Sequence, residues 1–197
     1  MAQSPPATSS PSRLPPILLT WSLMTAVAAA IFGAIVARIY DGSGSDSLPR
    51  LMLGVLIGGL IVGGLEWQTL RLYKISMGPL WCGVNAGMLV LIASIIGPLG
   101  SIAEGNGLLT LPLWGLMLDV PRWGILRSRL PRAGRWIAFC GLGWITDIVL
   151  LPLAGLFTIN IYGSTVAYVA LNGAINGIWM GLCRGGALMV MLRDRPQ

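Results

Sequence analysis

Six long apolar segments alternate with short polar breaks along this chain. They cover residues 17–39, 51–70, 80–99, 108–126, 136–156 and 163–182. Each is about 20 residues long, the length that an α-helix needs to cross the hydrocarbon core of a bilayer. The segments are continuously apolar rather than alternating in polarity, which favours helices over a transmembrane β-barrel. The pattern therefore predicts an all-α membrane protein, a bundle of six transmembrane helices.

The breaks between the apolar segments carry turn-forming residues. They are Asp41-Gly-Ser-Gly-Ser-Asp46, Met77-Gly-Pro79, Gly97-Pro98 with Glu104-Gly-Asn-Gly107, Arg129-Leu-Pro-Arg132 and Thr158-Ile-Asn160. Residues 1–16 are rich in Ser and Pro, lack the plan of a signal peptide, and are predicted to be a disordered cytoplasmic tail. We predict a transmembrane domain over 17–184. The apolar stretch 185–192 is too short to span by itself and either extends the last helix or lies in the interface. Residues 185–197 are predicted to be a short cytoplasmic or interfacial tail.

Composition supports a membrane location. The 197 residues are 55% hydrophobic and 10% charged, whereas a soluble domain carries about 25% charged residues. In lipid the backbone amides must be satisfied within helices or a closed barrel. The net charge is +6, but the basic residues lie at the ends of apolar segments. We therefore expect the lipid bilayer, and no nucleic acid, as the partner of these charges.

The basic residues sort by side if six spans are drawn. One side holds eleven of them: Arg13, Arg71, Lys74, Arg122, Arg127, Arg129, Arg132, Arg135, Arg184, Arg193 and Arg195. The other side holds only two, Arg38 and Arg50. Because cytoplasmic loops carry the excess of Lys and Arg, this asymmetry predicts that both termini are cytoplasmic and that the number of spans is even.

A tryptophan recurs at a fixed interval, since Trp67, Trp123 and Trp179 are 56 residues apart. The same offset relates further residues, namely Leu70, Leu126 and Leu182, and Arg71 and Arg127, while Arg184 falls one position late. The spacing predicts a helical hairpin repeated with a 56-residue period. Each unit runs inward to a W-x-x-L-R end, makes a short basic loop and returns outward.

Tryptophan prefers the headgroup region, and arginine reaches past it to phosphate. Six residues are therefore predicted to be interfacial anchors: Trp67, Arg71, Trp123, Arg127, Trp179 and Arg184. Trp81 and Trp136, which follow the basic loops, are placed at the same interface. The third unit stops after its first helix. The first segment, with Trp21 near its start, is interpreted as the returning helix of a truncated preceding unit.

The segment Gly63-Gly-Leu-Glu-Trp-Gln-Thr-Leu-Arg71 resembles the "GLxQWLVLR" helix ends of a group of uncharacterised bacterial multi-pass membrane proteins, frequent in cyanobacteria. The segment Gly134-Arg-Trp-Ile-Ala-Phe-Cys-Gly-Leu-Gly-Trp144 is similar to the tryptophan-rich return helix of that group. Glu66 departs from the pattern, which has Gln there, and Arg122 holds the matching place in the second unit. The resemblance implies a repeat-built helical protein of the bacterial inner (cytoplasmic) or thylakoid membrane, and it implies no activity.

Small residues recur at four-residue spacing on several segments. These are Ala26, Ala30 and Ala34; Gly54 and Gly58; Gly59 and Gly63; Gly83 and Gly87; and Gly173, Gly177, Gly181 and Gly185. In lipid such stripes allow close helix packing. They serve either packing within the bundle or contacts with other membrane subunits or a second copy. The alanine stripe of the first segment and the glycine stripe of the last are the candidates for an outward-facing seam.

Polar residues inside the membrane are costly and so mark candidate sites. A polar layer is predicted in the cytoplasmic half of the bundle, made of Asp147, Asp119, Asn176, Asn172, Glu66 and Asn85. One hypothesis is a shared substrate or proton site between Asp119 and Asp147. The alternative is local neutralisation, in which Asp119 pairs with Arg122 at i+3, Glu66 pairs with Arg71, Lys74 or Arg122, and the Asn side chains bond across the seams.

Catalytic, metal and cofactor signatures are absent from the sequence. There is no histidine, which excludes the histidine-dependent hydrolases, HExxH proteases and histidine-ligated haem. No P-loop, Gly-x-Ser-x-Gly or carboxylate-rich metal motif occurs. Cys82, Cys140 and Cys183 lack CxxC spacing and are interpreted as small buried side chains. We predict no catalytic residues, no metal site, no cofactor and no enzyme activity.

Two functions remain from the sequence, and the first is favoured. It is a non-catalytic subunit or scaffold that packs against partner membrane chains. The second is a small-solute transport or ligand-binding unit with a polar site around Asp147 and Asp119. Six spans with an alanine stripe in the first are similar, as a fold-level analogy, to the substrate-binding subunits of energy-coupling-factor transporters. A cavity that reaches the aspartates favours the second function, and a polar layer without a cavity favours the first.

Overall fold

The computed structural model describes residues 14–41, 47–103, 107–158 and 165–194, and these ranges form six α-helices without a β-strand. The helices are α1 (Leu14–Asp41), α2 (Ser47–Leu72), α3 (Leu80–Ala103), α4 (Gly107–Leu126), α5 (Gly134–Thr158) and α6 (Thr165–Arg193). The predicted all-α six-helix bundle is confirmed, and each predicted segment coincides with one helix. Of the predicted tail 1–16, only residues 14–16 are described, as the start of α1.

The last helix corrects one predicted boundary. The sequence ended the transmembrane domain at 184 and made 185–197 a separate tail. In the structure α6 continues to Arg193, and Leu188 and Met191 are at most 1% exposed. Residues 185–193 therefore belong to the bundle. Of the two alternatives for the apolar stretch 185–192, the structure has the extension of the last helix, so the predicted boundary at 184 does not separate a tail from the bundle.

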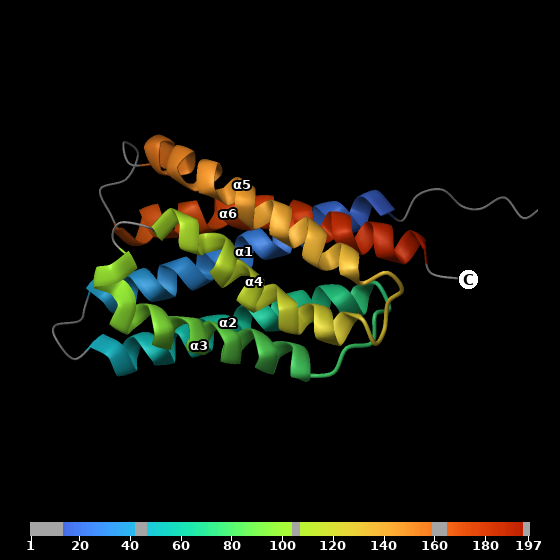
Figure 1. The fold of residues 1–197 in the computed structure, drawn as a ribbon, viewed down its shortest axis with the longest axis horizontal. Coiled ribbons are helices and arrows are strands. Elements are labelled where there is room, and N and C mark those ends of the chain that lie inside the picture. Colours follow the sequence, from blue (N-terminus) through green and yellow to red (C-terminus); the bar gives the residue numbers. More distant parts are fainter. Residues whose placement is uncertain (1–13, 42–46, 104–106, 159–164, 195–197) are drawn as a thin grey trace, which may run out of the picture.

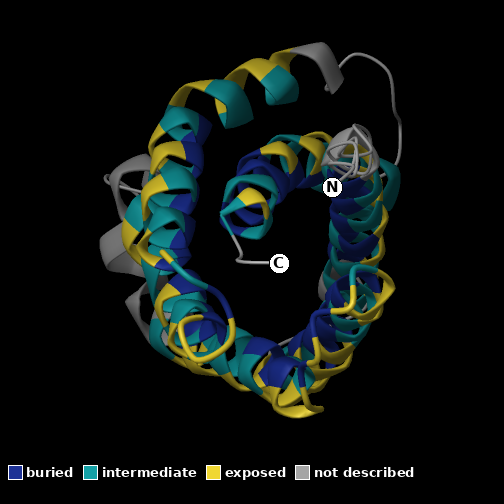
Figure 2. Ribbon diagram, turned by 90° about the vertical axis from the view of Figure 1, so that its right-hand side faces the viewer, coloured by how far each residue is buried: buried dark blue, intermediate teal, exposed yellow. Residues whose placement is uncertain are grey.

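The helices form a closed ring in which, within the described chain, each helix packs against two others (Figures 1 and 2). Neighbours in the sequence are neighbours in space, and α1 packs against α6 to close the ring. The N-terminal end of α1 and the C-terminal end of α6 lie at the same end of the bundle (Figure 1). The connections 73–79 and 127–133 lie at this end too, with exposed Arg71, Lys74, Arg127, Arg129 and Arg132. We call it the basic end.

The glycine stripe of α6 packs directly on α1. A Cβ atom at Gly177 would lie 2.6 Å from the Cα of Ala26, and one at Gly181 would lie 2.5 Å from the Cα of Ser22. Gly173 faces the backbone of Ala29 in the same way. Backbone cannot move aside as a side chain can, so only glycine permits this approach. The two stripes that the sequence offered as an outward seam are therefore turned toward each other inside the molecule.

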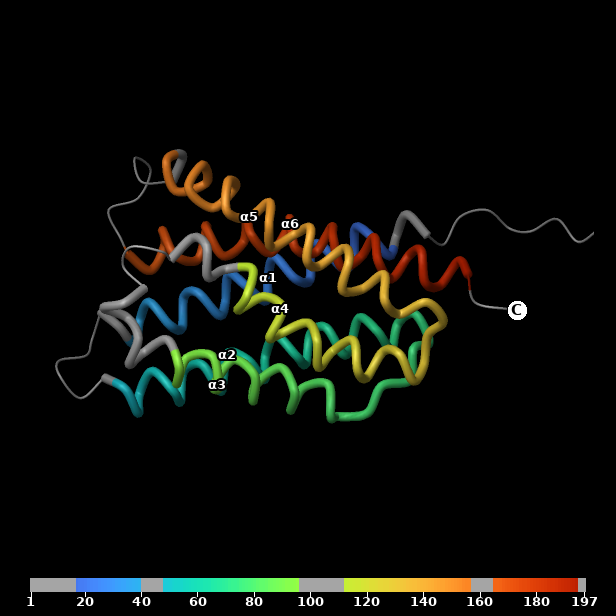
Figure 3. Tube along the Cα trace, viewed as in Figure 1, coloured from blue at the N-terminus to red at the C-terminus, as the bar shows by residue number. Residues whose placement is uncertain are grey.

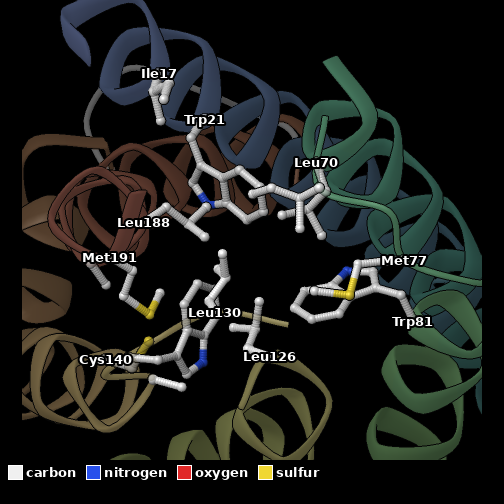
Figure 4. Packing of buried hydrophobic residues seen from close by; sticks show 14 residues of the cluster. Ile17, Trp21, Leu70, Met77, Trp81, Leu126, Leu130, Cys140, Leu188 and Met191 are labelled. Carbon is white, nitrogen blue, oxygen red and sulfur yellow. The ribbon is translucent and has the colours of Figure 1, made fainter. Parts of the chain in front are cut away.

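The ring is filled near the basic end by large apolar side chains (Figure 4). Trp21 of α1, Trp81 of α3 and Trp136 of α5 are at most 1% exposed. Trp136 meets Trp21 edge-to-face at 6.3 Å and Trp81 at 6.2 Å between ring centroids. We call these three residues, with Leu70, Leu126 and Leu188, the tryptophan core. Trp81 and Trp136 were predicted to be interfacial, which is wrong because both point into the ring rather than outward.

The end of α2 shows how the chain turns at the basic end. The amide of Ile75 donates to the carbonyl of Leu70 at 3.0 Å, and that of Lys74 to the carbonyl of Arg71 at 3.0 Å. This is a Schellman motif, and its apolar contact is supplied by Leu70 and Ile75, both buried in the core. Lys74 takes the left-handed conformation, φ 57°, where glycine is usual. Arg132 in the second loop has φ 53°.

The outer surface of the ring is apolar. Four helices, α1, α2, α5 and α6, are long and apolar enough to cross a membrane, and α3 has a shorter apolar stretch, Leu80–Ile95, within the described residues. Leu19, Leu23 and Val27 are half exposed or more along one stripe of α1, as are Leu142, Ile145 and Val149 on α5. So large an apolar surface is unusual on a soluble monomer. The apolar helices are those expected of a membrane-embedded protein.

Candidate functional site

Four charged side chains from three helices form a closed set of ion pairs inside the ring. Glu66 comes from α2, Asp119 and Arg122 from α4, and Arg184 from α6. Arg122 lies 3.4 Å from Glu66 and 3.0 Å from Asp119. Arg184 lies 3.4 Å from Glu66 and 3.2 Å from Asp119. Each carboxylate thus contacts both guanidinium groups, and all four side chains are at most 6% exposed. We call these residues the ion-pair quartet.

Polar groups from α3 and α5 complete the surroundings of the quartet. The indole nitrogen of Trp81 donates to Glu66 at 3.2 Å, and that of Trp144 donates to Asp119 at 2.8 Å. The side-chain oxygen of Asn85 accepts a hydrogen bond from the guanidinium group of Arg122. The amide nitrogen of Asn85 donates to the carbonyl of Trp81 at 2.9 Å. Five helices, α2 to α6, therefore meet at this level.

The quartet is a structural element rather than a binding site. It holds two positive and two negative groups, so its net charge is zero. Taking charges out of water is costly unless each is paired and hydrogen-bonded. Here every carboxylate already has two guanidinium partners and an indole donor, so no unpaired charge remains to attract a substrate. The pairing joins α2, α4 and α6 across the ring.

Asp147 lies in different surroundings, between α5 and α6. It is 1% exposed. Its Oδ2 accepts a hydrogen bond from the amide nitrogen of Asn176 at 2.5 Å. Within the described part of the chain no Lys or Arg nitrogen lies within 4.0 Å of Asp147, in contrast to both carboxylates of the quartet. Asp147 is therefore a buried carboxylate without a cation partner in these residues.

A cavity of about 500 Å³ opens beside Asp147. It is lined by Asp147, Leu150, Leu151, Leu153, Ala154, Asn172, Ile175, Asn176, Ile178, Trp179 and Leu182. All of them belong to α5 and α6, which diverge away from the basic end (Figure 3). Pro152 lies within the lining segment of α5, and a proline inside a helix removes a backbone hydrogen bond and bends it. The volume is within the range of about 300–1,000 Å³ usual for small-molecule sites.

The polar layer predicted from the sequence is therefore two separate groups. Asp119, Glu66 and Asn85 belong to the quartet and its surroundings, while Asp147, Asn176 and Asn172 line the cavity. The predicted neutralisation of Asp119 by Arg122 at i+3 is confirmed, as is the pairing of Glu66 with Arg122. The shared site between the two aspartates is not formed, because Asp119 is taken up by two arginines.

Arg184 was predicted to be an interfacial anchor, and this is wrong. Its side chain is buried in the quartet, because α6 continues beyond it to Arg193. Trp179 likewise lies inside α6 rather than at its end. Its indole nitrogen donates to Thr146 Oγ1 at 2.8 Å and to the Gly143 carbonyl at 3.2 Å. One signal was available in the sequence, since Arg184 has apolar residues on both sides and falls out of register with the W-x-x-L-R pattern.

The other four predicted anchors do lie at helix ends near the basic end. The Arg71 guanidinium stacks on Trp67 at 4.9 Å from the ring centroid, and that of Arg127 stacks on Trp123 at 5.2 Å. The indole nitrogen of Trp67 also donates to the carbonyl of Met77 at 2.6 Å, which ties α2 to the following loop. Their position at a membrane interface stays a prediction.

Comparison of the chain with protein-family models, with curated proteins and with solved structures finds no match in any of the three. The resemblance to the "GLxQWLVLR" group stays a prediction.

Proposed function

We propose that the chain is a multi-pass integral membrane protein with six spans and both termini in the cytoplasm. Arg122 and Arg184 are buried, so they no longer count as loop charges. Nine basic residues still remain on the predicted cytoplasmic side, against two on the other. This asymmetry supports the proposed orientation, and the resemblance supports a bacterial inner or thylakoid membrane.

We also propose that the bundle is built from repeated hairpins, with a changed register in the third unit. Glu66, Arg122 and Arg184 each stand four residues before a fully buried leucine of the tryptophan core: Leu70, Leu126 and Leu188. This places the third unit 62 residues after the second, not 56. The returning helix of that unit is then α1, which packs on α6. Trp21 of α1 would correspond to Trp81 and Trp136.

For the activity, the geometry best supports a non-catalytic, small-ligand binding or transport unit. The observation that carries this proposal is the cavity between α5 and α6, whose lining is apolar except for Asp147, Asn172 and Asn176. Largely apolar pockets with a few convergent polar groups are the usual form of small-molecule sites. A buried intramembrane carboxylate is costly and commonly serves a ligand or an ion.

A scaffold is the second candidate, and one observation on α3 favours it. Gly83 and Gly87 are exposed, and a Cβ atom at either position would meet nothing within 4 Å. They therefore offer a small-residue face on which a helix of another chain, or of a second copy, could pack closely. In this case the cavity would have no ligand, and function would lie in assembly.

Native mass spectrometry of the protein extracted from its host membrane in mild detergent separates the two candidates. We expect a small molecule of defined mass on the wild-type chain and its loss from Leu151→Trp, because an indole there would occupy the cavity. The matched control is Leu142→Trp on the outer face of α5, where the leucine is 59% exposed. A chain without bound ligand that carries a stoichiometric partner protein would reject the binding unit and favour the scaffold.

A further inference from the structure

Asp147, which lines the cavity, differs from the other buried carboxylates of the bundle in its charged partners. Glu66 and Asp119 are each balanced by two guanidinium groups. Asp147 is also buried, but its hydrogen bond comes from the neutral amide of Asn176 rather than from a guanidinium group. A buried carboxylate is stable when a cation and further hydrogen bonds accompany it. Within the described residues no Lys or Arg nitrogen lies within 4.0 Å of Asp147, so an ammonium group on a ligand would form an ion pair that this carboxylate does not make with them.

The wall opposite this carboxylate suits an apolar body. Seven of the lining residues are Leu, Ile or Ala, and Trp179 adds an aromatic ring. The indole nitrogen of Trp179 is already bonded to Thr146 and Gly143, so the ring contributes its π surface rather than its donor. An aromatic face attracts a cation within about 6 Å of its centre. Both the charged and the aromatic lining therefore favour the same ligand chemistry.

The cavity also opens toward the lipid-facing surface. Leu153, Ile175, Ile178 and Leu182 line it and are 37–45% exposed on the outside of the ring. On the basic-end side the bundle is closed by the ion-pair quartet and the tryptophan core. An apolar molecule dissolved in the bilayer could therefore enter sideways between α5 and α6.

We propose that this cavity binds an apolar small molecule bearing a single protonated amine, which enters from the lipid and places its ammonium group against Asp147. The inference rests on the proposed binding function and adds the chemical class of the ligand. Asp147 accepts from the ammonium group, Asn176 holds the carboxylate in place, and the leucines and isoleucines cover the apolar body. A carboxylate ligand would be repelled by Asp147, and an alcohol would form no ion pair with it.

Three probes with one carbon skeleton test the ligand class: phenylbutylamine, phenylbutanol and phenylbutyrate. Their binding is measured on the full chain in lipid nanodiscs by displacement of radiolabelled phenylbutylamine. We expect the amine to bind the wild-type protein about tenfold or more tightly than the alcohol, and the carboxylate to bind least. A tenfold difference in affinity corresponds to about 1.4 kcal/mol of binding free energy. Asp147→Asn should abolish the preference for the amine, while Asp194→Asn, outside the cavity, should leave it unchanged.

The outcomes separate this inference from the proposed function. If the alcohol binds as well as the amine and Leu151→Trp prevents both, the cavity is a ligand site but the amine class is wrong. If Leu151→Trp leaves amine binding unchanged, the molecule binds elsewhere, and the inference is overturned. If no probe binds, the inference fails, and mass spectrometry of the extracted protein then decides on the proposed function. The wild-type comparison of the three probes needs no variant, so a misfolded Asp147→Asn chain does not prevent the test.

Discussion

Replacing Arg184 by Met should destabilise the bundle severely. The change removes one of the two positive groups of the ion-pair quartet and leaves Glu66 and Asp119 to share Arg122. Both carboxylates are at most 2% exposed, so water cannot solvate the excess charge. Breaking a buried ion pair by removing one partner costs about 3–5 kcal/mol. We expect a loss of this size in the free energy of unfolding.

A second change tests whether charge balance is the cause. The double variant Arg184→Met with Glu66→Gln restores a neutral set, made of Arg122 and Asp119. Residues within one ion-pair network couple by about 0.5–3 kcal/mol. We therefore expect the double variant to be more stable than the sum of the two single losses predicts. Arg193→Met serves as the matched control, since Arg193 is exposed on the same helix, and its effect should stay within about 0.5 kcal/mol.

The assay is reversible unfolding in mixed micelles by increasing SDS, followed by tryptophan fluorescence. Two of the eight tryptophans, Trp81 and Trp144, donate to the carboxylates of the quartet, so part of the emission change comes from its loss. A loss below about 1 kcal/mol for Arg184→Met would refute the reasoning, since that is the range of an exposed ion pair. Strict additivity in the double variant would refute it as well, because it would mean that the two residues do not interact.

Three further predictions concern other contacts. Gly177→Ala should lower stability by about 1–3 kcal/mol, because its Cβ would lie 2.6 Å from the backbone of Ala26; thermal melting checks this against Gly64→Ala, where nothing lies within 4 Å. Lys74→Gly should raise the melting temperature and Lys74→Val should lower it, because φ at Lys74 is 57° and a non-glycine residue in this conformation costs of order 1–3 kcal/mol. The reverse order of melting temperatures would contradict the Schellman turn. Loss of water contact raises the pKa of Asp194, but Arg135 and then Arg132 outweigh it and lower the pKa overall. Because the pKa of Asp194 is lower in the folded state than in the unfolded state, its stabilisation of the fold is present above the unfolded-state pKa and is lost as the pH falls through the folded-state pKa. Asp194→Asn should therefore lose less of its melting temperature on acidification than the wild type. Identical pH profiles of the two proteins would contradict this.

The sequence predicted the helices well because each depends on local information. A continuous apolar run in lipid must form a helix to satisfy its own backbone, so the position of all six could be read directly, although α6 is longer than predicted. The ends of helices could also be predicted from neighbouring residues where turn-forming residues follow, as at Trp67 and Arg71 near the end of α2. The prediction failed at Arg184, because the helix runs through it and no turn residue marks a boundary.

The polar residues show the limit of that information. The depth of Glu66, Asp119 and Asp147 along their helices followed from counting residues, and their importance followed from the cost of burying them. The direction in which each points around its helix depends on packing. Glu66 and Arg184 are 118 positions apart and meet only because α1 and α6 close the ring.

The sequence by itself therefore determined that this protein is a six-helix membrane bundle with an apolar surface and one basic end. These properties arise from hydropathy and charge summed along single segments. Only the tertiary structure decided that Asp119 is neutralised within the ion-pair quartet while Asp147 faces an apolar cavity. Two aspartates on neighbouring helices differ because the packing of those helices determines which side chains lie within reach of a cation.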